Sequence, residues 1–291
     1  MRCIICGKEK EPSKEHIIPQ ALGNEKLVSF NVCENCNNLL GTRVDDYFVN
    51  HAITKIIRQN VFNDKNIKIM PGVMEGSDGN KYDITKNGYK IHPEFMRNSD
   101  GSARVIASNI EEGMKLARKK LERYKIPDNQ IESIISKAVV GEKEQSKPTF
   151  SLPIEINFGK VCLSITKIAY ELAYEDIGSA YYDDPIAIKM RTALNNAIQK
   201  KDVDYDELRN LVFPVEPEYY KGIEEIAKIE PSWNPLHIIA FWKQGRILGC
   251  FIYLFLNFKV AFSVILSNSA DVYSVKHEII IVQKNGNLIP L

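Results

Sequence analysis

The residues of this 291-residue chain that could do chemistry lie within its first 46 positions. Two Cys-x-x-Cys pairs stand on either side of an acid–histidine pair, Glu15-His16. Four thiolates at this spacing suit one tetrahedral Zn²⁺, to which each pair supplies two ligands. The predicted zinc ligands are Cys3, Cys6, Cys33 and Cys36. The sulfurs are therefore predicted to hold the fold together, and the acid, the histidine and an amide to carry the reaction.

Composition places the chain among ordinary globular proteins. Hydrophobic residues make up 44% and charged residues 26%, and the net charge of +1 neither indicates nor excludes a polyanionic partner. The most apolar run, residues 247–258, is too short to span a membrane, and the chain opens on a charged, cysteine-bearing motif instead of a secretory signal. We therefore expect a cytoplasmic protein without a membrane partner, in which paired cysteines bind metal more often than they form disulfides.

The elements that would hold these residues follow from hydrophobic spacing. Apolar residues recur at three- and four-residue steps from Leu39 to Ile57, which predicts one long amphipathic helix starting near residues 33–37. A turn at the first cysteine pair and a helix starting at the second is the layout of a treble-clef zinc module.

The rest of the chain predicts a larger mixed domain. Short β-prone runs are expected at 66–70, 81–85, 89–92 and 103–108, with an Asn87-Gly88 hairpin turn. Helices are expected at 110–124, 128–139, 161–177 and 185–200, the last capped by Asp183 or Asp184, and a strand at 150–158. After a connection at 202–232, an antiparallel β-meander is expected at 236–243, 247–258, 259–266 and 272–283. The fold class is α+β, with a zinc domain at 1–62 and an α+β domain at 63–291.

The first domain resembles the HNH endonuclease superfamily. The resemblance rests on Cys-x-x-Cys, then Glu15-His16-Ile-Ile-Pro19, then Cys-x-x-Cys-Asn-Asn ending at Asn38, and it covers roughly residues 3–46. It is closest to the zinc-containing branch in which the third motif residue is Asn instead of His. An acid–histidine pair followed by two apolar residues and proline, between two such cysteine pairs, is a specific combination.

The resemblance implies a ββα-metal fold that cleaves phosphodiester bonds, usually in DNA, with one divalent cation. His16 would be the general base that activates water, and Glu15 and Asn37 would hold Mg²⁺ or Mn²⁺, with Asn38 the alternative to Asn37. The residue types support this independently: an imidazole with a pKa near ~6.5 accepts a proton near neutral pH. A hard cation prefers carboxylate and amide oxygens to thiolates. In an ideal strand, however, Glu15 and His16 would point to opposite faces, so both can serve one site only if the backbone twists or the metal lies at the strand edge.

Several neighbouring polar residues have other expected roles. The family's middle Asn braces the loop that carries the His; Asn31 is assigned this role and Asn24 is the alternative. Asp45 and Asp46 lie further along the predicted helix and are expected on a solvated face or beside Arg43. His51 is too far along that helix to share the metal.

The function of residues 63–291 is left open by the sequence, with substrate selection, dimerisation or ligand sensing as the choices. Lysines and arginines between Lys115 and Lys125, and again between Lys189 and Lys201, are expected to form solvated helix faces. The leading hypothesis is a Mg²⁺- or Mn²⁺-dependent DNA endonuclease, with RNA and a homodimer not excluded. The resemblance alone implies a role in a restriction, phage-defence or mobile-element system. The alternative is a non-catalytic zinc module that binds nucleic acid or protein. A third hypothesis is a nuclease kept silent by the C-terminal domain, which truncation near residue 63 would activate.

Overall fold

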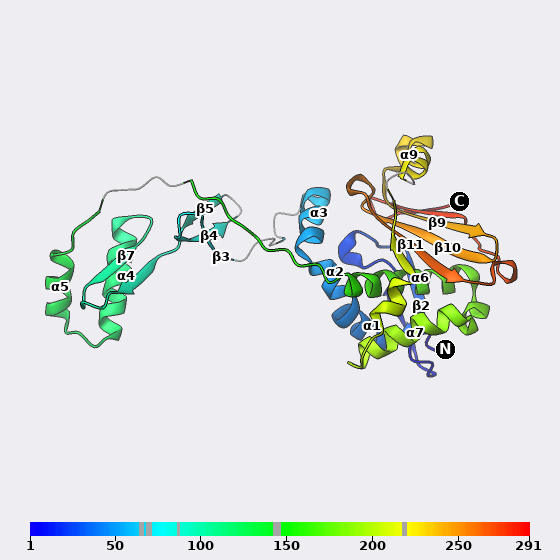
Figure 1. Cartoon of the computed structure of the whole chain (residues 1–291), viewed down its shortest axis with the longest axis horizontal. Helices are drawn as coiled ribbons and strands as arrows, with labels where there is room; N and C mark the ends of the chain where they lie inside the picture. Colours follow the sequence, from blue (N-terminus) through cyan, green and yellow to red (C-terminus); the bar gives the residue numbers. More distant parts are fainter. Residues whose placement is uncertain (64–66, 68–71, 86–87, 142–146, 217–219) are drawn as a thin grey trace. The chain divides into compact units, whose positions relative to one another are not determined.

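The computed structural model describes residues 1–63, 67, 72–85, 88–141, 147–216 and 220–291. The chain divides into two compact units (Figure 1). The main unit combines residues 1–64 with 155–291, and the inserted unit is residues 65–154. The expected division into 1–62 and 63–291 differs from this one, because residues 155–291 pack into the same core as the cysteine motif.

The cysteine motif folds as a hairpin followed by a helix. Strand β1 (Pro12–His16) pairs antiparallel with β2 (Val28–Cys33), and helix α1 (Glu34–Leu40) begins directly at the second cysteine pair. This is the order of elements that the treble-clef prediction requires.

The helix expected to continue to Ile57 is divided instead. After α1 comes a π-helical segment, η2 (Gly41–Asp45), then α2 (Asp46–Asn50) and α3 (Ala52–Phe62). His51 has extended backbone angles, φ −61° and ψ 142°, and its Nδ1 accepts a hydrogen bond from the Ile53 amide at 3.3 Å. The prediction of one long helix was wrong because apolar spacing continues across a residue that ends one helix and caps the next.

Helix α6 (Phe158–Ile177) lies at the centre of the main unit and is buried along most of its length. It contacts the cysteine motif directly: Ser164 Oγ donates to the Val44 carbonyl at 2.8 Å, and Tyr170 Oη to the Ile4 carbonyl at 2.8 Å. Helices α7 (Pro185–Ile198) and α8 (Tyr205–Arg209) follow. Asp184 caps α7 as expected, since its Oδ1 accepts from the Ile186 amide at 2.8 Å.

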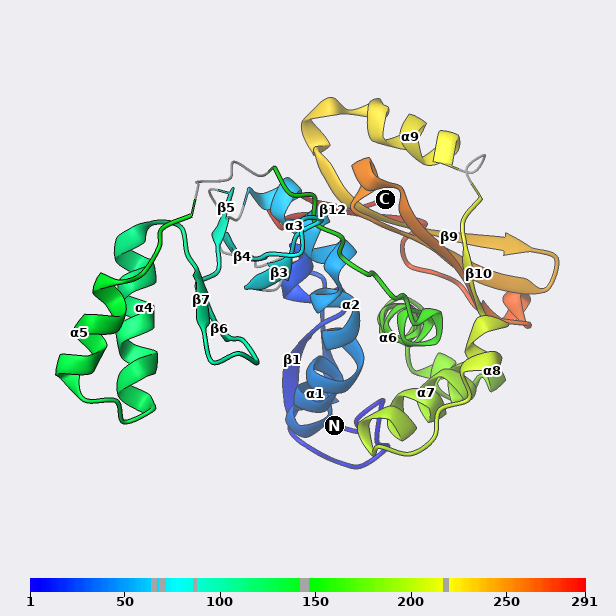
Figure 2. The ribbon, with the colours of Figure 1, turned by 60° about the vertical axis from the view of Figure 1, so that its left-hand side comes forward.

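The C-terminal half forms a six-stranded antiparallel sheet in the order β13-β12-β9-β10-β11-β8. Side chains alternate between its faces: Ile252 packs into the core with α6 and α7, whereas Tyr253 packs against α9 (Tyr220–Ile229) on the other face (Figure 2). The expected C-terminal antiparallel sheet is confirmed, although β12 crosses back to pair with β9. The strands are β8 Val212–Pro214, β9 Pro235–Gln244, β10 Ile247–Leu254, β11 Val260–Ser267, β12 Ile279–Gln283 and β13 Leu288–Pro290.

The inserted unit has its own small sheets and helices. In its three-stranded sheet, the rings of Tyr82 and Tyr89 meet the ring of Phe150 edge to face, and a separate two-stranded hairpin packs against α4 (Ile110–Arg123). Its elements are β3 Val73–Glu75, β4 Lys81–Thr85, β5 Gly88–Ile91, β6 Glu94–Arg97, β7 Ala103–Ile106, α4 Ile110–Arg123 and α5 Asp128–Ser136.

Three expectations outside the cysteine motif need comment. The strand expected at 150–158 does not form; Phe150 makes one isolated bridge, and Ile154 and Ile156 are 41% and 55% exposed. The alternating apolar residues of this segment do not pair with a strand in the described ranges, and Asn157 caps the start of α6 instead. Of the strand expected at 66–70, only residue 67 lies within the described residues. Asn87 of the expected hairpin turn lies outside them. No helix in the described ranges is long and apolar enough to cross a bilayer.

Candidate functional site

The four cysteines of the two pairs come together at one end of the β1–β2 hairpin. Their sulfur atoms all lie within 4.8 Å of one another, so the four could hold one zinc ion. The Cys33 amide donates to the Cys3 sulfur at 3.4 Å. A hydrogen bond from the Cys36 thiol lowers the pKa of Cys3 to about 4, and the same bond raises the pKa of Cys36. The short distances between the sulfur atoms therefore favour the thiolate form of Cys3.

Glu15 and His16 line one cavity, which we call the acidic pocket. The register of β1 against β2 shifts between Ser13 and Glu15, so the strand is irregular where the motif begins. Irregularities of this kind change the direction of side chains next to active sites. Glu15 and His16 can therefore line the same cavity, although they would point to opposite faces of an ideal strand. The cavity has a volume of about 280 Å³ and is lined by Glu15, His16, Pro19, Gln20, Ala21, Asn37, Gly41, Asp45, Asp46, Val49 and Asn50.

The imidazole of His16 is partly withdrawn from solvent. Burial lowers its pKa from the ordinary value and the charge of Lys14 lowers it further, while the charge of Glu15 acts in the opposite direction. The buried Nε2 has no hydrogen-bond partner among the described residues. A buried polar atom without a partner is unusual away from functional sites.

Glu15 is bound by Lys167, which comes from the centre of α6. The Lys167 ammonium lies 2.5 Å from Glu15 Oε1, and it also donates to the His16 carbonyl at 2.7 Å and the Ile17 carbonyl at 3.2 Å. These three bonds use all three ammonium hydrogens. The lysine side chain is wholly buried, and Glu15 Oε2 is buried without a partner in the described part of the chain.

Two more carboxyl groups surround this ammonium. Asp45 Oδ2 lies 3.5 Å and Glu171 Oε2 3.3 Å from Lys167 Nζ. Burial raises the pKa of Asp45 to about 6 and that of Glu171 well above its ordinary value. Burial alone would lower the pKa of Lys167, but the three carboxylates raise it above its usual range. The cluster is therefore a buried ammonium surrounded by three acidic side chains.

Asn37 reaches the acidic pocket from the first turn of α1. Its Nδ2 donates to Ser13 Oγ at 3.2 Å and to the Lys14 carbonyl at 2.9 Å. With its amide hydrogens bonded to β1, the carbonyl oxygen is the atom left for a cation. Asn38 is exposed and does not line the pocket.

The loop after His16 is braced by Asn24, the alternative to Asn31. The fully buried Asn24 amide donates to the Ile18 carbonyl at 2.7 Å and the Leu27 carbonyl at 2.8 Å, and its oxygen accepts from the Leu27 amide at 2.8 Å. Asn31 instead donates to Glu175 at 2.7 Å, on α6. Asn24 therefore closes the loop after His16 by hydrogen bonds, whereas the side-chain amide of Asn31 bonds α6.

Sequence reasoning missed Lys167, Glu171 and Asp45. The apolar spacing predicts Lys167 and Glu171 only as part of the helix at 161–177, although a lysine and a glutamate four residues apart within such spacing indicate a buried pair. Asp45 was expected on a solvated face, but it is only 7% exposed. It lies in the π-helical segment, and such segments often occur at functional sites.

Residues 3–53 match the family model of the HNH endonucleases, which confirms the resemblance carried by the cysteine and acid–histidine motifs. The match includes the four cysteines and ends just beyond Asn50, the last residue that lines the acidic pocket. No curated protein and no solved structure matches the chain.

Proposed function

With an HNH endonuclease segment at residues 3–53 as the premise, we propose that the acidic pocket hydrolyses phosphodiester bonds in DNA. The observation that carries the proposal is the unpartnered Nε2 of His16 in a cavity that Glu15 and Asn37 also line. A general base, a carboxylate and an amide in one cavity are the groups that metal-assisted hydrolysis of a phosphodiester needs.

His16 is the proposed general base. Its lowered pKa keeps the imidazole neutral at physiological pH, and Nε2 accepts the proton of the attacking water.

Glu15 Oε2 and the Asn37 carbonyl oxygen are the proposed ligands of Mg²⁺ or Mn²⁺. Both are oxygen donors, and a buried carboxylate oxygen without a partner fits a cation ligand. The bound cation supplies charge neutralisation for the phosphate in the transition state. Lys167 holds the other carboxylate oxygen and the backbone of His16 and Ile17, so it positions both the ligand and the base. Zn²⁺ at the four cysteines has a structural role.

The test compares plasmid cleavage by the wild type, His16→Ala and His51→Asn in the presence of Mg²⁺ or Mn²⁺. We expect His16→Ala to retain zinc and the native circular dichroism spectrum while the cleavage rate falls by at least 100-fold. His51→Asn is the matched control because asparagine keeps the cap of α3, and it should cleave at the wild-type rate. Cleavage by His16→Ala at the wild-type rate would contradict the assignment of His16 as the general base. If neither the wild type nor any variant cleaves, but the wild type binds DNA, the non-catalytic zinc module is the better description.

A further inference from the structure

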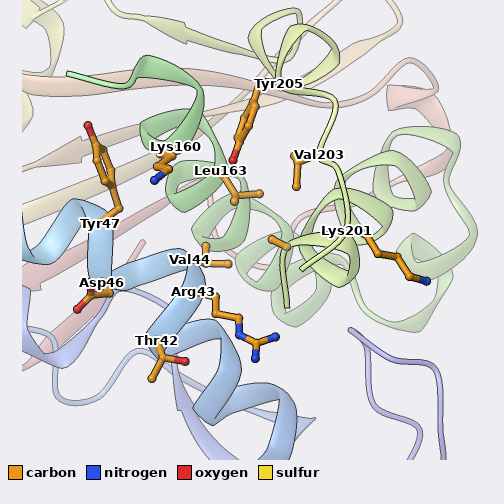
Figure 3. Close-up of a pocket in the computed structure, with 11 residues that line it drawn as sticks. Thr42, Arg43, Val44, Asp46, Tyr47, Lys160, Leu163, Lys201, Val203 and Tyr205 are labelled. Atoms are coloured by element: carbon orange, nitrogen blue, oxygen red, sulfur yellow. The ribbon is translucent and has the colours of Figure 1, made fainter. Parts of the chain in front are cut away.

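A second cavity adjoins the acidic pocket, and we call it the cationic pocket (Figure 3). It has a volume of about 280 Å³ and Asp46 lines both cavities. The charged groups on its wall are Arg43 from η2, Lys160 from the first turn of α6 and Lys201 from the segment after α7, against the single acid Asp46. The cavity is therefore net positive, whereas its neighbour is acidic.

The three cations are not neutralised by the protein. In the ranges that the structure describes, none of them forms an ion pair with a carboxylate. Arg43 donates to the Ile198 carbonyl, and Lys160 Nζ lies 5.2 Å from the centroid of the Tyr47 ring. Lys201 is exposed, at the rim, with its ammonium turned outward in Figure 3. By contrast, Lys189 on α7 pairs with Glu207 at 2.9 Å.

Two tyrosines give the cavity fixed aromatic walls. Tyr47 Oη accepts a hydrogen bond from the Asn157 amide at 2.6 Å. The Tyr205 ring lies against Gly159, where a Cβ atom would come within 2.8 Å of it, so only glycine permits this approach. Fixed aromatic rings beside unpaired cations are the chemistry with which proteins bind a base and its phosphate.

We propose that the cationic pocket binds a phosphate-bearing nucleotide. This inference rests on the proposed function, since the ligand would be either a nucleotide of the substrate strand beside the scissile phosphate or a free nucleotide. The acidic pocket repels a polyanion, so an adjoining positive cavity supplies the attraction that brings the strand to it.

The experiment measures binding of a fluorescent DNA duplex by anisotropy, without added divalent cations, over a range of salt concentrations. Lys160→Ala/Lys201→Ala is compared with Lys189→Ala/Lys221→Ala, which removes the same charge from exposed positions outside the cavity. We expect the pocket variant to bind about tenfold more weakly and its salt slope to fall by about two, one for each lost phosphate contact. The control variant should bind as the wild type does.

Competition separates the two sources of the ligand. Displacement of the duplex by deoxyadenosine 5′-monophosphate, but not by deoxyadenosine, supports a strand nucleotide in the pocket. Saturable binding of the monophosphate by the wild type, lost in the pocket variant without any change in duplex affinity, supports a free nucleotide. Wild-type affinity of the pocket variant for both probes overturns the proposal. A failure of the proposed function would be seen in a separate measurement, because His16→Ala would then cleave plasmid DNA at the wild-type rate.

Discussion

The ammonium of Lys167 lies 2.5 Å from the carboxylate of Glu15, although the two residues are 152 positions apart in the sequence. Glu15 belongs to the HNH segment, and Lys167 belongs to the central helix of the part of the chain that the family match does not cover. The residues on which the proposed chemistry depends are therefore held by a helix from outside the family segment.

Replacing Lys167 with methionine should destabilise the protein by about 3–5 kcal/mol, because removal of one partner leaves an uncompensated charge on buried Glu15. Urea unfolding measures the loss. Lys189→Met, which removes an exposed lysine, should change the free energy of unfolding by no more than about 0.5 kcal/mol.

Adding Glu15→Gln to Lys167→Met should recover part of the stability, because the second change removes the stranded charge. A double-mutant cycle gives the coupling between the two positions. Additive losses would mean that the two groups do not interact in solution as they do in the structure.

The sequence could predict the parts of the site that depend on local spacing. The four cysteines, the hairpin and helix order, and the C-terminal antiparallel sheet all follow from patterns within a few dozen residues. The Lys167–Glu15 pair could not be predicted, because no local pattern states which helix will pack on a strand 152 positions away.

The same limit applies to the domain division. A change of composition near residue 63 marks the end of the HNH segment, but it does not show that the chain returns to the same core at residue 155. Truncation near residue 63 would therefore remove Lys167, Glu175 and the rest of α6 from the motif. Inactivity of such a fragment would report an incomplete site, so it is not a clean test of a nuclease kept silent by its C-terminal part.

Asn24→Ala should slow DNA cleavage more than Asn31→Ala does. The first change leaves the Ile18 carbonyl and the Leu27 amide without their buried partner, at a cost of about 1–3 kcal/mol for each unsatisfied group, whereas the Leu27 carbonyl still accepts from the Ile17 amide at 3.1 Å. Hydrogen exchange should become faster across residues 17–27, which form the loop after His16. Equal effects of the two changes on cleavage and on exchange would contradict the bracing role of Asn24.

The chain should carry one zinc ion, and Cys36→Ser should lose it. Cys162→Ala is the matched control, because Cys162 is buried in α6 away from the cluster and should leave the zinc content unchanged. Chelation should raise hydrogen exchange in residues 1–53, since metal binding contributes much of the folding free energy of such small modules. Unchanged circular dichroism and protease resistance after chelation would count against a zinc site at the four cysteines.

His237 should make the protein sensitive to acid. The ring is wholly buried: Nε2 donates to the Leu22 carbonyl at 2.8 Å, and Nδ1 accepts from the Phe255 amide at 3.1 Å. Burial lowers the pKa of His237 to about 4, from 6.5. Protonation would place a hydrogen on Nδ1 against an N–H donor, so only the neutral ring fits. Because the unfolded chain takes up this proton first, the stabilisation is complete above pH 6.5 and is lost as the pH falls toward 4.

The predicted loss from this one group is about 3 kcal/mol across that window, from the pKa difference. Urea unfolding of the wild type and His237→Gln at a series of pH values isolates it, because the other titrating groups are common to both proteins. The stability difference between the two should shrink by about 3 kcal/mol from pH 7 to pH 4. A difference that stays constant with pH would show that His237 titrates alike in the folded and unfolded states.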